Sequence, residues 1–340
     1  MKIGIVNDRP LAVEALRRAV ALKPEHQVIW VAKNGLEAVD LCTKTPPGLV
    51  LMDLLMPQMD GVEATRRIMA SSPCPILVVT FNVGANSCRA FEAMGHGALD
   101  AVDTPTLGSG DLREKAAPLL MKIDSIGRML GSAGGFQPAG AVGGAQPRPL
   151  SGDRLIAIGA SAGGPAALAT VLRGLPKDFP AAIVLVQHVD EQFVAGMAEW
   201  LGQQSRFPVR VAAEGDRPTP GRVLLAGTRD HLALKAPDRL GYTPEPREYA
   251  YRPSVDVFFY SVGQHWRGEA VGVLLTGMGR DGALGLKALR NQGHYTIAQD
   301  EATSAVYGMP KAAATLRAAV DTLPVDRIAS KLVDVLASKA

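Results

Sequence analysis

Short apolar runs alternate with amphipathic segments along most of this 340-residue chain. Segments such as 10–22, 61–70 and 281–292 place apolar residues three or four positions apart, which predicts helices. The runs between them have strand length and are almost continuously apolar, as is typical of parallel strands buried on both faces. We therefore predict an α/β fold in both halves, each a parallel sheet covered by helices on both sides, with a hairpin within 222–243. The predicted strands are 2–6, 27–32, 48–53, 75–81 and 97–102 in the first half, and 154–159, 181–188, 222–227, 270–277 and 294–299 in the second.

A segment of different composition, residues 131–150, separates the two halves. Nine of its twenty residues are Gly or Pro, and Arg148 is its one charged residue. Such a segment cannot bury enough apolar surface to fold, so we interpret it as a flexible linker. The expected division is a domain over 1–118, a linker over 119–150 that starts as a helix, and a second domain over 151–340.

Composition narrows the functional classes. Hydrophobic residues make up 47% of the chain and charged residues 20%, which is ordinary for a globular protein. A net charge of +3 without a basic run argues against nucleic-acid binding. No apolar run approaches the roughly 20 residues of a membrane span, and the start MKIGIVNDRP lacks a signal-peptide pattern. The three cysteines form no CxxC pair, so we expect free thiols and a cytoplasmic protein without membrane insertion.

Polar residues follow the predicted strands of the first half. Asn7 and Asp8 follow the first strand, Asp53 ends the third, and Thr80 lies at the end of the fourth. Because the carboxyl ends of parallel strands share one edge of a sheet, we expect these side chains to converge. Two carboxylates there need a cation, for which Mg²⁺ is the natural candidate, and a carboxylate can accept a phosphoryl group that the metal and Thr80 hold. Spacing alone leaves open that the aspartates are helix caps or solvated side chains.

The stretch MDLLMPQMDG, residues 52–61, resembles the receiver domain of two-component response regulators, and the resemblance extends over about residues 1–118. It implies a flavodoxin-like fold with Asp53 as the phosphoacceptor. It also implies Asp8 and the backbone carbonyl of Leu55 as Mg²⁺ ligands, and a sensor histidine kinase of the chemotaxis type as the phosphodonor.

Three positions depart from the receiver pattern. Receivers usually carry two acids at the end of the first strand, and the first of these is Asn7 here. Thr104 takes the place of the lysine that precedes a proline, and Ala101 takes that of an aromatic switch residue. We expect phosphorylation at Asp53, while the usual readout through that lysine and aromatic residue is missing.

The second half opens on RLIAIGASAGGP, residues 154–165, in which an apolar run ends in glycines around Ser161. GASAG fits G-x-S-x-G, the pattern of a nucleophilic serine on a sharp strand-to-helix turn. Backbone amides at the start of the following helix would stabilise an oxyanion. A plain tight turn and a phosphate-binding loop remain alternatives, although Ser161 occupies the place of the middle glycine that G-x-G-x-x-G requires.

A serine hydroxyl needs a base to become nucleophilic. His188 directly follows a strong apolar run and is expected at the same sheet edge as Ser161, and Asp281 follows the glycine-rich turn after another strand. Taken singly, a histidine such as His188 is more often structural, and Asp281 is typical of a helix N-cap. His188 and Asp190 have the H-x-D spacing of a metal pair, but no third ligand has a convincing spacing. Together, Ser161, His188 and Asp281 predict a Ser-His-Asp site, in a chain order that differs from that of α/β-hydrolases.

Six stretches of the second half then resemble the chemotaxis protein-glutamate methylesterase family, which joins a receiver to a C-terminal esterase through a linker. The resemblance implies Ser161 as nucleophile, His188 as base and Asp281 as orienting acid. It further implies that the Met278 amide contributes to the oxyanion hole, on a Rossmann-like sheet without a cofactor for the esterase. Ala162 departs from the threonine of many members. The matching stretches are IGASAGGP, VQHVDEQF, TPGRVLLAG, YRPSVDVFF, LLTGMGRDGALGLKAL and AVYGMPKAA.

The family resemblance implies a function for the whole chain. The expected reaction is hydrolysis of glutamate γ-methyl esters on methyl-accepting chemoreceptors, with release of methanol, and receptor glutamines are a second implied substrate. We expect the receiver to cover the esterase cleft until Asp53 is phosphorylated. The pathway is motility or a chemosensory-type system that controls biofilm or surface behaviour. A DNA-binding regulator, a non-catalytic adaptor and a nucleotide-dependent enzyme are the alternatives.

Overall fold

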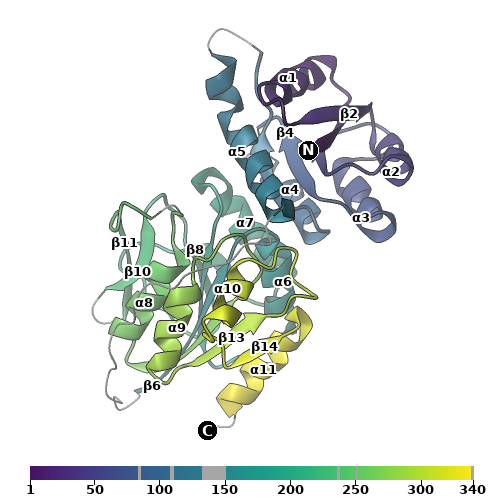
Figure 1. Cartoon of the computed structure of the whole chain (residues 1–340). Helices are drawn as coiled ribbons and strands as arrows, with labels where there is room; N and C mark the ends of the chain where they lie inside the picture. Colours follow the sequence, from purple (N-terminus) through teal and green to yellow (C-terminus); the bar gives the residue numbers. More distant parts are fainter. Residues whose placement is uncertain (83–85, 108–110, 132–150, 236–237, 250, 338–340) are drawn as a thin grey trace. The chain divides into compact units, whose positions relative to one another are not determined.

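The computed structural model describes residues 1–82, 86–107, 111–131, 151–235, 238–249 and 251–337 (Figure 1). The chain divides into two compact units, Met1–Gly135 and Phe136–Ala340, and each is described by itself. The Gly/Pro-rich part of the predicted linker, residues 132–150, lies outside the described residues. No helix in the described part of the chain is both long enough and apolar enough to span a membrane.

The first unit is a five-stranded parallel sheet with the strand order β2-β1-β3-β4-β5. This is the flavodoxin-like order, and all five predicted strands are found. The sheet order reverses between β1 and β3, so the ends of these two strands form the crevice. The elements are β1 Lys2–Val6, α1 Pro10–Ala21, β2 Gln27–Ala32, α2 Gly35–Lys44, β3 Leu49–Met52, α3 Gly61–Ser71, β4 Ile76–Thr80, α4 Ser87–Gly95, β5 Asp100–Asp103 and α5 Leu112–Gly131.

Helix α5 changes the expected end of the first unit. It runs past residue 118, where the predicted domain ended, to Gly131. Leu119, Ile123 and Ile126 are buried in the same core as the strands β1, β3 and β4. The helical start of the predicted linker therefore belongs to the first unit, because its apolar face covers the sheet rather than solvent.

The second unit contains a seven-stranded parallel sheet with the order β14-β13-β12-β6-β7-β9-β8, and an antiparallel hairpin of β10 and β11. The five predicted strands and the hairpin are confirmed, while β8 and β14 were not predicted. The elements are β6 Ser151–Ala160, α6 Gly164–Gly174, β7 Ala182–Gln187, α7 Glu191–Gln204, β8 Val209–Val211, β9 Val223–Leu225, β10 His231–Lys235, β11 Arg239–Thr243, α8 Val255–His265, β12 Gly268–Leu274, α9 Ala283–Asn291, β13 Tyr295–Gln299, α10 Met309–Thr315, β14 Asp321–Leu323 and α11 Val325–Ala337.

Without β8, this sheet has the strand order of a doubly wound nucleotide-binding fold. We number the six strands from 1 to 6 in chain order, as β6, β7, β9, β12, β13 and β14. Their order across the sheet is then 3-2-1-4-5-6, which confirms the Rossmann-like prediction. The order reverses between β6 and β12, and these strands are neighbours in the sheet. Their carboxyl ends are tied together, because the Ser161 amide donates a hydrogen bond of 3.0 Å to the Thr276 carbonyl. A crevice for ligands is expected at this point.

Candidate active site

Ser161 lies at the end of β6, immediately before α6, and its exposed fraction is 9%. The turn between them is tight, since the Gly164 amide donates to the Ser161 carbonyl over 2.7 Å. Gly163 has a φ of 73°, and a Cβ at this position would lie 2.4 Å from the Cβ of Ala305. The glycine is therefore required both by the left-handed backbone and by the close approach of a neighbouring segment.

His188 reaches the same edge from the adjacent strand. Ala160 of β6 pairs with Gln187 of β7, and the His188 amide donates to the Ala160 carbonyl. The buried Gln187 side chain joins the two loops, because its Nε2 donates to the Ser161 carbonyl over 2.9 Å and to the His188 carbonyl over 3.1 Å. The prediction that His188 follows the strand next to that of Ser161 is confirmed.

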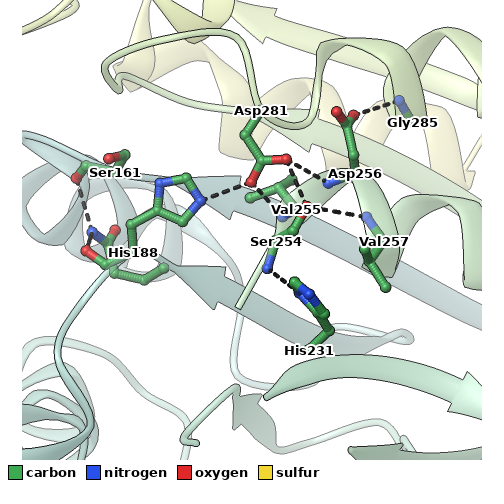
Figure 2. Close-up of polar contacts among 10 residues, drawn as sticks. Ser161, His188, His231, Ser254, Val255, Asp256, Val257, Asp281 and Gly285 are labelled. Atoms are coloured by element: carbon green, nitrogen blue, oxygen red, sulfur yellow. Dashed lines mark hydrogen bonds and ion pairs between the residues drawn. The ribbon is translucent and has the colours of Figure 1, made fainter. Parts of the chain in front are cut away.

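Asp281 receives four hydrogen bonds although its exposed fraction is only 7%. Its Oδ2 lies 2.8 Å from His188 Nε2 and accepts from the Val255 amide over 2.7 Å. Its Oδ1 accepts from the Ser254 hydroxyl over 2.7 Å and from the Asp256 amide over 3.1 Å (Figure 2). Burial raises the pKa of Asp281, but the bonds from His188, Ser254 and Val255 outweigh burial and lower that pKa below its ordinary value.

The helix-cap interpretation of Asp281 is wrong for the helix that follows it. Helix α9 begins at Ala283 behind Gly282, and no side chain caps it from that N-cap position. Asp281 instead binds the amides at the N-terminus of α8, a helix that begins 26 residues earlier in the chain. Its carboxylate is thereby held by one helix end while it contacts the imidazole.

The imidazole of His188 lies between Ser161 and Asp281, with Nδ1 on the side of Ser161 (Figure 2). Nδ1 is buried and has no hydrogen-bond partner among the described residues. The carboxylate that faces Nε2 favours the tautomer with the proton on Nε2, in which Nδ1 is the acceptor atom. Hydrogen bonds between a catalytic serine and its histidine are often long or poorly aligned when no substrate is bound. The structure brings the three predicted residues together at one place.

The loop after β12 completes this edge. The Thr276 amide donates to Gln299 Oε1 over 2.8 Å, and the Gly277 amide donates to the Val306 carbonyl. A Cβ at Gly277 would lie 2.7 Å from the Cβ of Ser161. Met278 follows directly, so its backbone is close in sequence to the point where this loop meets the serine. Its predicted oxyanion role stays a prediction.

Sequence reasoning missed two polar residues of this site. Gln187 directly precedes His188, and Ser254 precedes an apolar run as an N-cap residue does. Ser254 caps α8 and is fully buried, and its hydroxyl binds Asp281. A cap signal was therefore visible in the sequence, but which carboxylate it would meet depends on the tertiary fold.

The first unit places Asp53 at its own crevice. Its carboxylate is buried, accepts from the Leu54 amide over 2.8 Å and accepts from Asn7 Nδ2 over 3.0 Å. Burial raises the pKa of Asp53, and the negative charge of Asp8 raises it further, although hydrogen bonds from Thr80 and two backbone amides oppose the rise. Of the predicted residues, Asn7, Asp53 and Thr80 are thus buried together.

Asp8 and Leu55 lie at the exposed rim of this crevice. The side-chain Oδ1 of Asn7 accepts from the Arg9 backbone amide over 2.9 Å, and its Nδ2 donates to Asp53, so the carboxamide of Asn7 is held at both atoms. Thr104, in the place of the receiver lysine, donates its own amide to the Thr80 carbonyl. Ala101 is buried in β5, which leaves no aromatic ring at that place.

A serine, an imidazole and a carboxylate at the switch point of a doubly wound sheet are the arrangement of a serine hydrolase. The family model described as CheB methylesterase matches residues 156–332. The model described as Response regulator receiver domain matches residues 3–116. The chain belongs to the CheB methylesterase family.

Relatives agree over the full length. The protein-glutamate methylesterase/protein-glutamine glutaminase 4 of Burkholderia thailandensis is 64% identical over 337 residues, which cover 99% of this chain and 98% of that protein. A protein-glutamate methylesterase/protein-glutamine glutaminase of group 3 operon from Pseudomonas putida is 63% identical over 338 residues, which cover 99% of this chain and 100% of that protein. The crystal structure of the Thermotoga maritima CheB methylesterase catalytic domain has a TM-score of 0.52 and 34% identity, and covers 55% of this chain and 100% of that one.

Proposed function

We propose that this protein is a protein-glutamate methylesterase that removes γ-methyl esters from chemoreceptor glutamates and is regulated by phosphorylation of its receiver unit. The observation that carries the proposal is the line of Ser161, His188 and Asp281 at the carboxyl edge of the second sheet. Family membership and the names of the relatives support the substrate class.

The proposed reaction begins with attack of Ser161 Oγ on the ester carbonyl. His188 Nδ1 takes the hydroxyl proton, while Asp281 holds Nε2–H and stabilises the imidazolium that forms. The Met278 amide and the amides at the start of α6 stabilise the oxyanion. When the intermediate collapses, the carbon–methoxide bond breaks and His188 returns its proton to the leaving oxygen, which departs as methanol.

Water resolves the acyl-enzyme by the same route. His188 takes a proton from water, the hydroxide attacks the acyl carbon, and Ser161 leaves with that proton. The product is the glutamate carboxylate. A receptor glutamine enters the same sequence with ammonia as the leaving group, so we propose glutaminase activity at the same serine. No step uses a cofactor.

In the first unit we propose Asp53 as phosphoacceptor, with a sensor histidine kinase of the chemotaxis type as donor. Asp8, Asp53 and the Leu55 carbonyl supply oxygen atoms that suit Mg²⁺. Burial and the negative charge of Asp8 raise the pKa of Asp53, and a cation at this place would stabilise its ionised form. When bound, the ion neutralises charge on the transferring phosphoryl group. Thr80 contacts the phosphoryl oxygens, and Asn7 contributes an amide where most receivers supply a second charge.

We place this activity in the cytoplasm. None of the three cysteines, all of which lie among the described residues, forms a disulfide, which suits a reducing compartment. The kinase, the receptor and the pathway are proposed as classes: a histidine kinase that phosphorylates Asp53, a methyl-accepting receptor, and a chemotaxis or surface-sensing system.

Methanol release tests the proposed function. The full chain is incubated with a receptor whose glutamates carry labelled methyl esters, and volatile label is collected with time. We expect catalytic release of methanol, and release of ammonia from a receptor form with glutamines at the same positions. A wild-type protein that releases neither product from its receptor contradicts the proposal.

A further inference from the structure

The ring of Tyr251 lies flat on the catalytic imidazole. The ring centroids of Tyr251 and His188 are 4.5 Å apart and the two planes differ by 1°. Tyr251 lies in the segment between β11 and α8, three residues before Ser254, whose hydroxyl binds Asp281. The imidazole is therefore fixed at its edge by a carboxylate and on one face by an aromatic ring.

The tyrosine also reaches the loop after β12. A Cβ at Gly279 would lie 2.9 Å from the hydroxyl oxygen of Tyr251. Gly279 has a φ of 80°, so this position favours glycine for its backbone as well. The close approach places the tyrosine beside the residue that follows Met278, at the edge where Ser161 and His188 meet.

We propose that Tyr251 is a positioning residue that stabilises the imidazolium form of His188 during acyl transfer. This inference rests on the proposed esterase site. The face of a tyrosine ring carries negative charge density and attracts a cation placed over it. His188 is neutral before attack and cationic after it takes the proton of Ser161, so the stacking energy grows as the transition state is approached.

The same contact restricts the movement of the imidazole. With Nε2 held by Asp281 and one face covered by Tyr251, the imidazole cannot tilt toward that face without losing the stacked contact. Asp281 sets the direction of the ring edge, and Tyr251 sets its plane. Removing the aromatic ring relaxes the plane and destabilises the protonated form.

Substitutions at Tyr251 leave the other titratable groups of this region unchanged. Asp281 contacts Nε2, and the buried Asp256 lies behind it, with its amide donating to Asp281. Tyr249 packs edge-on against His231, with centroids 6.1 Å apart and an interplanar angle of 78°. A comparison of substitutions at Tyr251 alone leaves all of these groups in place.

The test compares Tyr251→Phe and Tyr251→Leu with wild type in the full chain, and measures kcat, KM and the pH dependence of kcat/KM for methanol release. Tyr251→Phe keeps the stacked ring and is expected within about twofold of wild type. Tyr251→Leu is expected to lower kcat by roughly 3- to 30-fold, with little change in KM. The acid limb of its kcat/KM profile moves to lower pH, because the protonated imidazole is no longer favoured.

Tyr249→Leu is the matched control for damage to this segment, and is expected to leave the acid limb where it is. An unchanged kcat and acid limb in Tyr251→Leu would overturn the inference, and so would equal losses in Tyr251→Phe and Tyr251→Leu, because the hydroxyl would then be the active group. These results differ from failure of the proposed function, in which wild type itself releases no methanol.

Discussion

At the scale of single residues, the pKa values of two buried carboxylates of the second unit are shifted in opposite directions. Asp281 is surrounded by donors, which lower its pKa. Asp256 has a pKa raised to about 7, first by burial and then by the charge of Asp281. The lower of the two pKa values thus belongs to Asp281, the carboxylate that contacts His188.

The raised pKa of Asp256 predicts a pH-dependent stability. Its folded pKa of about 7 lies above its ordinary 3.8, so between these values the folded chain holds a proton that the unfolded chain releases. This contribution to the free energy of unfolding is full below the unfolded value and is lost as pH rises through the folded one. We therefore expect wild type to lose stability relative to Asp256→Asn as pH rises from about 4 to about 7, measured by urea unfolding.

The control for this measurement is Asp334→Asn, at an exposed position of α11. Its stability is expected to run parallel to that of wild type over the same pH range. A difference between wild type and Asp256→Asn that stays constant across the range would contradict the assignment of a raised pKa to Asp256.

At the scale of elements, two aspartates connect the N-terminal ends of α8 and α9. Asp281, before α9, accepts from the first amides of α8. Asp256, in the first turn of α8, accepts from the Gly285 amide in α9 over 2.6 Å. The first amides of α8 thus bind an aspartate from the loop before α9, and an amide in the first turn of α9 binds an aspartate of α8. These bonds fix the start of α8 against the loop that carries Asp281.

The cap residue Ser254 connects these bonds to the active site. Its fully buried hydroxyl donates to Asp281 and accepts from the Val257 amide. Ser254→Ala removes both bonds and leaves Asp281 with one donor fewer, so we expect a loss of about 1–2 kcal/mol in the free energy of unfolding. Esterase activity should fall as well. Chemical denaturation with a parallel methanol assay measures both.

Ser330→Ala is the matched control, because that exposed hydroxyl donates only within α11, to the Arg327 carbonyl. Its stability should match that of wild type within a few tenths of a kcal/mol. If Ser254→Ala and Ser330→Ala behave alike, the cap does not support Asp281 as the structure indicates.

Elements with a clear apolar pattern were predictable, and two of the three-residue strands were not. The nearly continuous apolar runs that form β1, β6 and β12 predict buried parallel strands from the sequence alone. The three-residue strands β8 and β14 carry too few residues for a pattern and are defined by pairing with their neighbours. Helix α5 was identified as helical, but its attachment to the first unit depends on burial of Leu119 and Ile123 against the sheet.

The residues of the candidate site also fall into a group that the sequence predicted and a group that it did not. Ser161, His188 and Asp281 were found because each follows a strand, and parallel strands end at one edge. The stacking of Tyr251 and the bridge made by Gln187 were not found, because they depend on how loops fold over that edge. The contact of Asp281 with His188 was expected, but its bonds to the start of α8 were not, because that helix comes from another part of the chain.

At the scale of the whole molecule, a phosphoacceptor unit and an esterase unit are joined in one chain, which predicts coupling between them. We expect phosphorylation of the full chain, by its kinase or a small acyl phosphate with Mg²⁺, to increase methanol release. Asp53→Asn should lose acyl-phosphate labelling and give no increase. The rate of labelled-methanol release with and without the phosphodonor measures this.

A fragment of residues 151–340 is the companion to that experiment. If the receiver restrains the esterase, the fragment is more active than the unphosphorylated full chain and does not respond to the phosphodonor. An unphosphorylated full chain as active as the fragment would contradict restraint, and persistent labelling of Asp53→Asn would move the acceptor to another residue.

The central claim is that Ser161 performs the hydrolysis, and one comparison tests it most directly. Methanol release from the methylated receptor is measured for wild type and Ser161→Ala at equal concentrations. Loss of one member of such a triad lowers the rate by roughly 10⁴–10⁶-fold, so we expect Ser161→Ala to show slow background release only. Methanol release by Ser161→Ala at a rate near that of wild type would contradict it.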